Sequence, residues 1–105
     1  MSDSIKKLQI NILKFLAKQP APVNADDVIV NDFVKIEIRE RLKYLYKEKM
    51  ISAIDMTDTA GIEFHNISIT EVGLKYLKEN SFIGKVKQLV DFIFKHLVSV
   101  IKISH

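Results

Sequence analysis

The stretch "KIEIRERLKYLYKEKMI", residues 35–51, combines an apolar stripe at helical spacing with a basic residue at every fourth position. The apolar stripe consists of Ile38, Leu42 and Leu45, with Ile51 just past the helix end. The basic row consists of Lys35, Arg39, Lys43 and Lys47. Because a helix turns once in about 3.6 residues, these basic side chains follow a slanting strip that can face one partner. The alternative is that they keep one side of an ordinary helix in water.

Two more helices are predicted before this stretch. Residues 3–18 carry apolar residues at helical spacing, and Pro20 and Pro22 end that helix because they lack the amide proton. Asn24 is expected to cap a short second helix in "ADDVIV", residues 25–30, whose Asp26 and Asp27 suit a helix N-terminus. The third helix is then predicted from about residue 33 to 49.

After the third helix the apolar period changes to about two. "ISAIDMT" (residues 51–57) and "IEFHNISI" (residues 62–69) are rich in β-branched and aromatic residues, and "DTAG" joins them in a turn where Gly61 can take a positive φ. The pattern predicts a β-hairpin. Thr70 is expected to cap a helix over residues 70–80, with Val72, Leu74 and Leu77 as candidate buried positions. A long apolar helix is predicted from residue 82 to about 103.

The predicted order of helix, helix, helix, hairpin and helix defines the fold class. It is α+β, mainly α: a winged helix with three helices, a two-stranded wing and a C-terminal helical extension. Residues 1–81 are assigned to the winged-helix domain, and residues 82–105 to an amphipathic helix of the same domain.

Two motifs carry a resemblance to winged-helix proteins. "IEIRERLKYLYKEKMI" (residues 36–51) resembles their third helix, and "ISITEVGLKYLKEN" (residues 67–80) resembles the strand and helix written "L-T-x-x-G-x-x-Y-L". Ile69, Thr70, Gly73, Tyr76 and Leu77 match the second motif position for position. Within that superfamily the chain is most similar to the small bacterial and phage family called YjcQ-like, in length and in the segment that follows "YLKEN".

The sequence departs from the winged-helix pattern in two places. Lys49 stands where the superfamily usually has a glycine that closes the third helix, so the turn is either strained by roughly 1 kcal/mol or built differently. The wing carries Asp55, Asp58 and Glu63, where many DNA-binding winged helices have Arg or Lys.

The resemblance implies that the third helix enters the major groove of double-stranded DNA. The DNA-binding residues expected from it are Lys35, Arg39, Lys43, Tyr46 and Lys47. One of Tyr44 and Tyr46 is expected to pack beneath the wing. The implied function is that of a small transcriptional regulator of bacterial, phage or mobile-element origin. The alternative is a winged helix used for protein interaction without DNA binding.

The composition argues against an enzyme and against a metal site. The chain has no cysteine, its glycines are isolated, and His65, His96 and His105 have no partner at metal-ligand spacing. We therefore expect no catalytic residues, cofactor, metal or small-molecule substrate. Lysines at positions 6, 7, 14 and 18 interrupt any signal peptide, and together with the absence of cysteine they favour a cytoplasmic protein.

The predicted final helix is more apolar than a small domain can easily cover. Its stripe consists of Val86, Leu89, Val90, Ile93, Phe94, Leu97 and Ile101. We expect this stripe to form a homodimer together with partial packing on its own domain, while packing on its own domain alone or lying on a membrane surface are the alternatives. Charged residues interrupt it too often for a membrane span.

Overall fold

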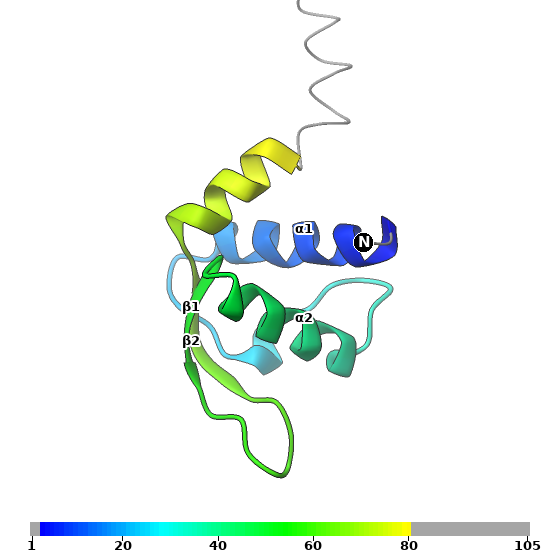
Figure 1. The fold of residues 1–105 in the computed structure, drawn as a ribbon, viewed down its shortest axis with the longest axis vertical. Coiled ribbons are helices and arrows are strands. Elements are labelled where there is room, and N and C mark those ends of the chain that lie inside the picture. Colours follow the sequence, from blue (N-terminus) through cyan, green and yellow to red (C-terminus); the bar gives the residue numbers. More distant parts are fainter. Residues whose placement is uncertain (1–2, 81–105) are drawn as a thin grey trace, which may run out of the picture.

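The computed structural model describes residues 3–80 of the chain (Figure 1). Helix α1 (Asp3–Lys18) is followed by a single 3-10 turn, η1 (Ala25–Asp27), and by helix α2 (Lys35–Lys47). Strands β1 (Ile51–Asp55) and β2 (Phe64–Ile69) come next, and residues 71–80 form a further α-helix. This order confirms the predicted α+β, mainly α fold of three helices and a hairpin. The predicted helix over residues 82–103 lies outside the described residues.

The hairpin pairs β1 with β2 antiparallel, with Ile51 opposite Ile69 and Asp55 opposite Phe64. At its tip Asp58 and Gly61 exchange backbone hydrogen bonds of 3.1 and 3.2 Å, and Gly61 has a φ of 143°. The predicted turn is therefore confirmed. Val23 adds a short third piece of sheet, because it exchanges backbone hydrogen bonds with Ile67 on β2.

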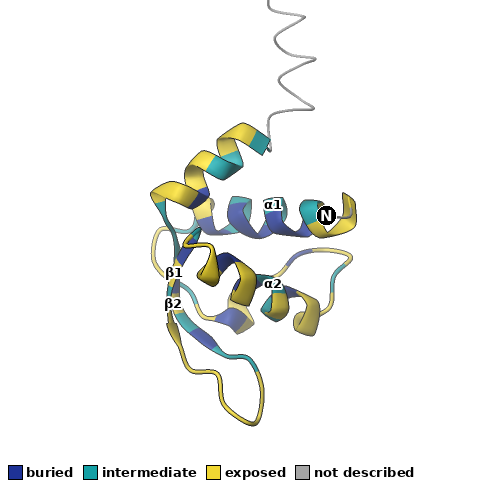
Figure 2. Cartoon of the chain, in the orientation of Figure 1, coloured by how far each residue is buried: buried dark blue, intermediate teal, exposed yellow. Residues whose placement is uncertain are grey.

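The hydrophobic core fills the space between α1, α2 and the hairpin, and Figure 2 shows the buried residues on the facing sides of the two helices. Ile38, Leu42 and Leu45 are all buried, as predicted for the inner stripe of α2. They meet Ile12 and Leu13 of α1 in one cluster, to which β2 adds Phe64 and Ile67. In Figure 1, α1 lies between α2 and the helix of residues 71–80, and the hairpin tip projects away from α1.

The predicted second helix over residues 25–30 is wrong beyond its first turn. Asn24 occupies the N-cap position as expected, but the chain becomes extended at Val28, with φ −81° and ψ 108°. Val28 and Val30 are buried while Ile29 between them is 71% exposed, which is the period of an extended segment. Burial of alternate β-branched residues against the core outweighs the weak helical preference of this segment.

Two further burial predictions are wrong. Val72 and Leu74 are 51% and 47% exposed, and only Leu77 of the three packs against the core. The reason is Gly73, which is buried between them and brings the helix backbone itself, instead of these side chains, against the end of α2.

Helix α2 ends in a Schellman motif with a lysine in the place where glycine is usual. Lys49 has a φ of 61°, the Met50 amide donates to the Leu45 carbonyl (2.9 Å), and the Lys49 amide donates to the Tyr46 carbonyl (3.1 Å). The turn is thus built in the usual way, and the lysine bears the strain that a glycine would avoid.

Thr70 and Gly73 lock the following helix onto this turn. The Thr70 hydroxyl donates to the Lys49 carbonyl (2.6 Å), and the Thr70 amide donates to the Met50 carbonyl (3.0 Å). The Thr70 hydroxyl also accepts from the Gly73 amide (3.1 Å), which makes it the predicted N-cap. A Cβ on Gly73 would lie 2.2 Å from the Met50 carbonyl oxygen, so this close approach requires a glycine.

Replacing Gly73 by alanine should destabilise the domain even though alanine is the better helix former. The added methyl overlaps a backbone carbonyl, and we expect a loss of about 2 to 3 kcal/mol, or roughly 10 °C or more in melting temperature. Val72→Ala, at an exposed neighbouring position, should change the free energy of unfolding by only about 0.5 kcal/mol. Thermal unfolding followed by circular dichroism measures both, and a Gly73→Ala variant as stable as the parent would contradict the close packing.

Replacing Lys49 by glycine should stabilise the chain. Glycine adopts the left-handed conformation without the steric cost that lysine bears, and we expect a gain of about 0.5 to 1 kcal/mol in urea unfolding. The same substitution inside α2, Lys43→Gly, should cost about 1 kcal/mol. A loss of stability in Lys49→Gly would show that the lysine side chain contributes more than its backbone conformation costs.

Candidate nucleic-acid interface

The side of α2 opposite the core carries a mixed row of residues, which we call the outer row. It consists of Ile36, Glu40, Lys43 and Lys47. At about 100° per residue these four positions fall within about 60° of one another, opposite the buried stripe. All four are exposed, and Ile36 is 66% exposed. The outermost surface of α2 is therefore only partly basic.

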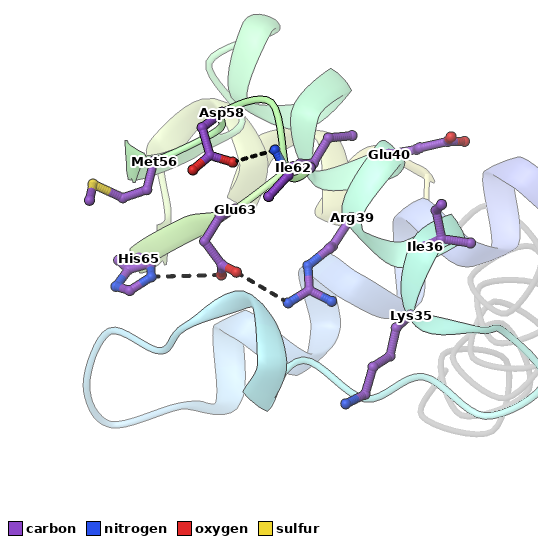
Figure 3. Close-up of a pocket in the computed structure, with 11 residues that line it drawn as sticks. Lys35, Ile36, Arg39, Glu40, Met56, Asp58, Ile62, Glu63 and His65 are labelled. Carbon is purple, nitrogen blue, oxygen red and sulfur yellow. Dashed lines mark hydrogen bonds and ion pairs between the residues drawn. The ribbon is translucent and has the colours of Figure 1, made fainter.

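The predicted basic row divides into two halves. Lys43 and Lys47 belong to the outer row. Around the helix axis, Arg39 lies about 70° and Lys35 about 110° from the middle of this row, on the side that faces the wing. An open groove of about 770 Å³ lies between this part of α2 and the wing. Figure 3 shows Arg39 directed across it toward Glu63, with His65 beyond.

Arg39 joins three elements by ion pairs. Its Nη2 contacts the Asp26 Oδ1 on η1 and lies 3.4 Å from the Glu63 Oε2 beside β2. The Glu63 carboxylate also lies 3.7 Å from the His65 Nε2. Only 20% of the Arg39 side chain is exposed. The hydrogen bond and the positive charge of Arg39 lower the pKa of Asp26 below its ordinary value.

Arg41, the second of the two arginines in the chain, is also held internally. Its Nη1 donates to the Oε1 of Gln9 (3.2 Å), and its guanidinium lies 4.6 Å from the centre of the Tyr44 ring. Gln9 is fully buried on α1, and its other end donates to the Met50 sulfur (3.9 Å). Burial raises the pKa of Tyr76, whose hydroxyl is in hydrogen-bond contact with the Gln9 side chain.

The acidic residues of the wing have structural partners. The Asp55 Oδ1 accepts from the Thr57 amide (2.9 Å), and the Asp58 Oδ1 accepts from the Ala60 amide (2.8 Å). Hydrogen bonds from Thr57 lower the pKa of Asp55, and the nearby positive charge of Lys43 acts in the same direction. These carboxylates shape the wing, and their charge lies beside the basic row.

Tyr46 is the tyrosine that packs at the base of the wing. Its ring lies 5.3 Å from the ring of Phe64 at an interplanar angle of 44°, and 38% of the residue is exposed. Tyr44, equally exposed, carries Arg41 on its face. For Tyr46, as for Lys35, Arg39, Lys43 and Lys47, contact with DNA stays a prediction.

Sequence reasoning missed several of these contacts. The sequence predicts Asp26 only as a helix-terminal residue, and it assigns no binding role to Ile36 or Glu40. Gln9 could have been found, because a polar residue within the apolar face of a predicted helix signals a buried hydrogen-bond partner. The residues assigned to dimerisation, from Val86 to Ile101, lie outside the described residues, so pairing through them also stays a prediction.

Two features are absent from residues 3–80. No helix in this part of the chain is long and apolar enough to cross a membrane. The same residues contain no cluster of three or more histidine or acidic side chains arranged to hold a metal ion.

The helices, the hairpin and the short bridge between Val23 and Ile67 define a winged-helix domain, in which α2 is the third helix of the core and the hairpin is the wing. The family model described as "YjcQ protein" matches residues 12–93, more than half of the chain. The chain therefore belongs to the YjcQ family.

Among solved structures, the chain is similar to the crystal structure of a "putative transcriptional regulator", TA0346, from Thermoplasma acidophilum. The TM-score is 0.56 at 20% sequence identity, over 92% of this chain and 93% of that chain. At this identity the likeness shows the fold alone. No curated protein matches the chain.

The ion pair between Arg39 and Asp26 should be visible as a low Asp26 pKa that depends on Arg39. Because the pKa of Asp26 is lowered on folding, the ion pair stabilises the fold at pH values above the ordinary pKa of 3.8. This stabilisation is lost as the pH falls through the lowered pKa. In an Arg39→Gln variant the Asp26 pKa should rise toward the ordinary value. Carboxyl carbon shifts in an NMR titration measure it.

Asp55 provides the control within the same spectra. Its pKa is lowered first by Thr57, so it should remain low in Arg39→Gln. An Asp26 pKa that is unchanged by the substitution would show that Arg39 does not hold this carboxylate in solution.

Proposed function

We propose that this YjcQ family protein is a DNA-binding regulator of transcription that uses α2 and the groove beside it as its nucleic-acid surface. The observation that carries the proposal is the exposed outer row of α2, where Lys43 and Lys47 stand with no hydrogen-bond or ion-pair partner within residues 3–80. Exposed lysines on the third helix of a winged-helix domain are placed to neutralise phosphates beside the major groove. The description of the Thermoplasma protein supports the same class of function.

The charges around α2 indicate which part of the domain contacts the DNA backbone. Asp55, Asp58 and Glu63 make the wing acidic, and their carboxylates would repel phosphates. Lys35 and Lys43 each lie close enough to one carboxyl group, Asp26 and Asp55 respectively, to lower its pKa, so the attraction of both lysines for phosphate is partly cancelled. We therefore place the phosphate contacts at the C-terminal half of α2, with Lys43 and Lys47, instead of at the wing tip.

The proposal includes a two-fold assembly through the apolar stripe of residues 86–101. A dimer would present two copies of α2, and a separation near one turn of DNA, about 34 Å, would let both enter successive major grooves. Such a regulator would act in the cytoplasm, where the DNA of a bacterium or phage is located.

Binding to random duplex DNA across a salt series tests the proposal. A protein that contacts four to six phosphates should lose affinity with a log–log slope of roughly −4 to −5. Replacing Lys43 and Lys47 together by alanine should weaken binding by at least about tenfold and reduce the slope by about 2, because two phosphate contacts are lost.

Lys78→Ala is the matched control, because Lys78 is an exposed lysine on the helix of residues 71–80 and is not part of α2. It should leave both affinity and slope close to those of the parent chain. Absence of binding at about 50 mM salt would overturn the proposal. That result would favour the protein-interaction alternative. The same alternative is supported by the fact that Arg39 and Arg41 both bind other residues of the domain.

A further inference from the structure

The commonest base contact in the major groove is an arginine or lysine bound to guanine, and in this structure neither arginine of α2 is free for it. The chain has two arginines, and both are on α2. Arg39 is held between Asp26 and Glu63, and Arg41 lies on the side of Gln9 and Tyr44. Releasing Arg39 would remove the guanidinium that both the Asp26 and the Glu63 carboxylate contact, and releasing Arg41 would remove the donor to the buried Gln9 Oε1.

Two residues of the outer row lie in the half of α2 that is best placed to reach bases. In helix-turn-helix complexes the N-terminal residues of the recognition helix contact base edges. Ile36 and Glu40 occupy this half, and Lys43 and Lys47 occupy the other. Figure 3 shows the Ile36 and Glu40 side chains leaving α2 on the same side, both at the edge of the groove beside the wing.

Within residues 3–80, neither Ile36 nor Glu40 has a structural role that would explain its exposed position. Ile36 is 66% exposed, although an isoleucine there adds nothing to the core. The Glu40 carboxylate has no hydrogen-bond or ion-pair partner in the part of the chain that the structure describes. A carboxylate on a helix that approaches phosphates is unfavourable unless it accepts a hydrogen bond from a base.

We propose that Ile36 and Glu40 determine the DNA sequence that this protein prefers, with Ile36 contacting the 5-methyl group of a thymine and Glu40 accepting a hydrogen bond from the 4-amino group of a cytosine. These are the major-groove partners of an apolar and an acidic side chain. Residues four apart on a helix are separated by about 6 Å along its axis, and stacked base pairs by about 3.4 Å. The thymine and the cytosine are therefore at most two base-pair steps apart. This inference rests on the proposed function.

Substitution of single groups on the DNA tests the Ile36 contact. Duplexes are first selected from a random pool with the full chain, and each thymine of the selected site is then replaced by deoxyuridine, which removes only the methyl group. At one position this should weaken binding about fourfold, the effect of one buried methyl group. In Ile36→Ala the same replacement should have no effect.

Ile29→Ala provides the matched control, because Ile29 is an isoleucine of similar exposure, 71%, that lies outside α2. It should retain the full sensitivity to deoxyuridine. Circular dichroism confirms that both variants are folded.

A change of preference tests the Glu40 contact. Glutamine pairs with adenine where glutamate accepts from cytosine, so selection with Glu40→Gln should replace the cytosine by adenine at that one position. Lys47→Gln, on the same row but about two turns beyond Glu40, should leave the selected base unchanged and only weaken binding.

The possible outcomes separate this inference from the proposed function. Salt-dependent binding with no deoxyuridine effect at any thymine, or with the same effect in Ile36→Ala, would overturn the assignment of Ile36 and leave DNA binding in place. An unchanged preference in Glu40→Gln would overturn the assignment of Glu40. Absence of any binding to the random pool would overturn the proposed function and this inference together.

Discussion

The fold depends on the two carbonyl groups at the end of α2. The Lys49 carbonyl accepts a hydrogen bond from the Thr70 hydroxyl, and the Met50 carbonyl accepts one from the Thr70 amide. Through these two bonds the end of α2, the start of β1, the end of β2 and the start of the next helix meet at one place. The approach is so close that Gly73 can carry no side chain. An intramolecular hydrogen bond contributes roughly 0.5 to 1.5 kcal/mol to stability, so these bonds together help to fix the junction.

The N-terminal half of α2 packs into the core through Ile38 and also makes ion pairs with two other parts of the chain. Arg39 connects it to η1 through Asp26 and to the wing through Glu63, and these pairs are partly shielded because only 20% of the Arg39 side chain is exposed. The two ends of α2 are thus held by different means, backbone hydrogen bonds at one end and ion pairs at the other. The pair between Arg39 and Glu63 spans the groove between α2 and the wing.

This arrangement has a direct consequence for function. The ion pairs that orient α2 also occupy its arginines, so the surface left for a partner is the outer row with its two lysines, one isoleucine and one glutamate. In the proposed complex with DNA, phosphate attraction and base preference would fall on different residues of one helix. Lysines supply affinity that does not depend on sequence, whereas an apolar and an acidic side chain can distinguish bases.

The sequence by itself determined the order of elements, the bounds of α1, the hairpin with its Gly61 turn, the inner stripe of α2 and the capping role of Thr70. These features depend on residues close together in the chain, where periodicity, caps and turns act. The tertiary structure alone decided that residues 28–30 are extended, that Gly73 excludes Val72 and Leu74 from the core, and that Arg39 and Arg41 turn inward. Their partners are distant in sequence: Arg39 pairs with residues 13 and 24 positions away, and Arg41 with one 32 positions away. No local pattern encodes such contacts. The core must first bring those segments together, because an arginine can pair with a distant residue only when the fold places the two side chains side by side.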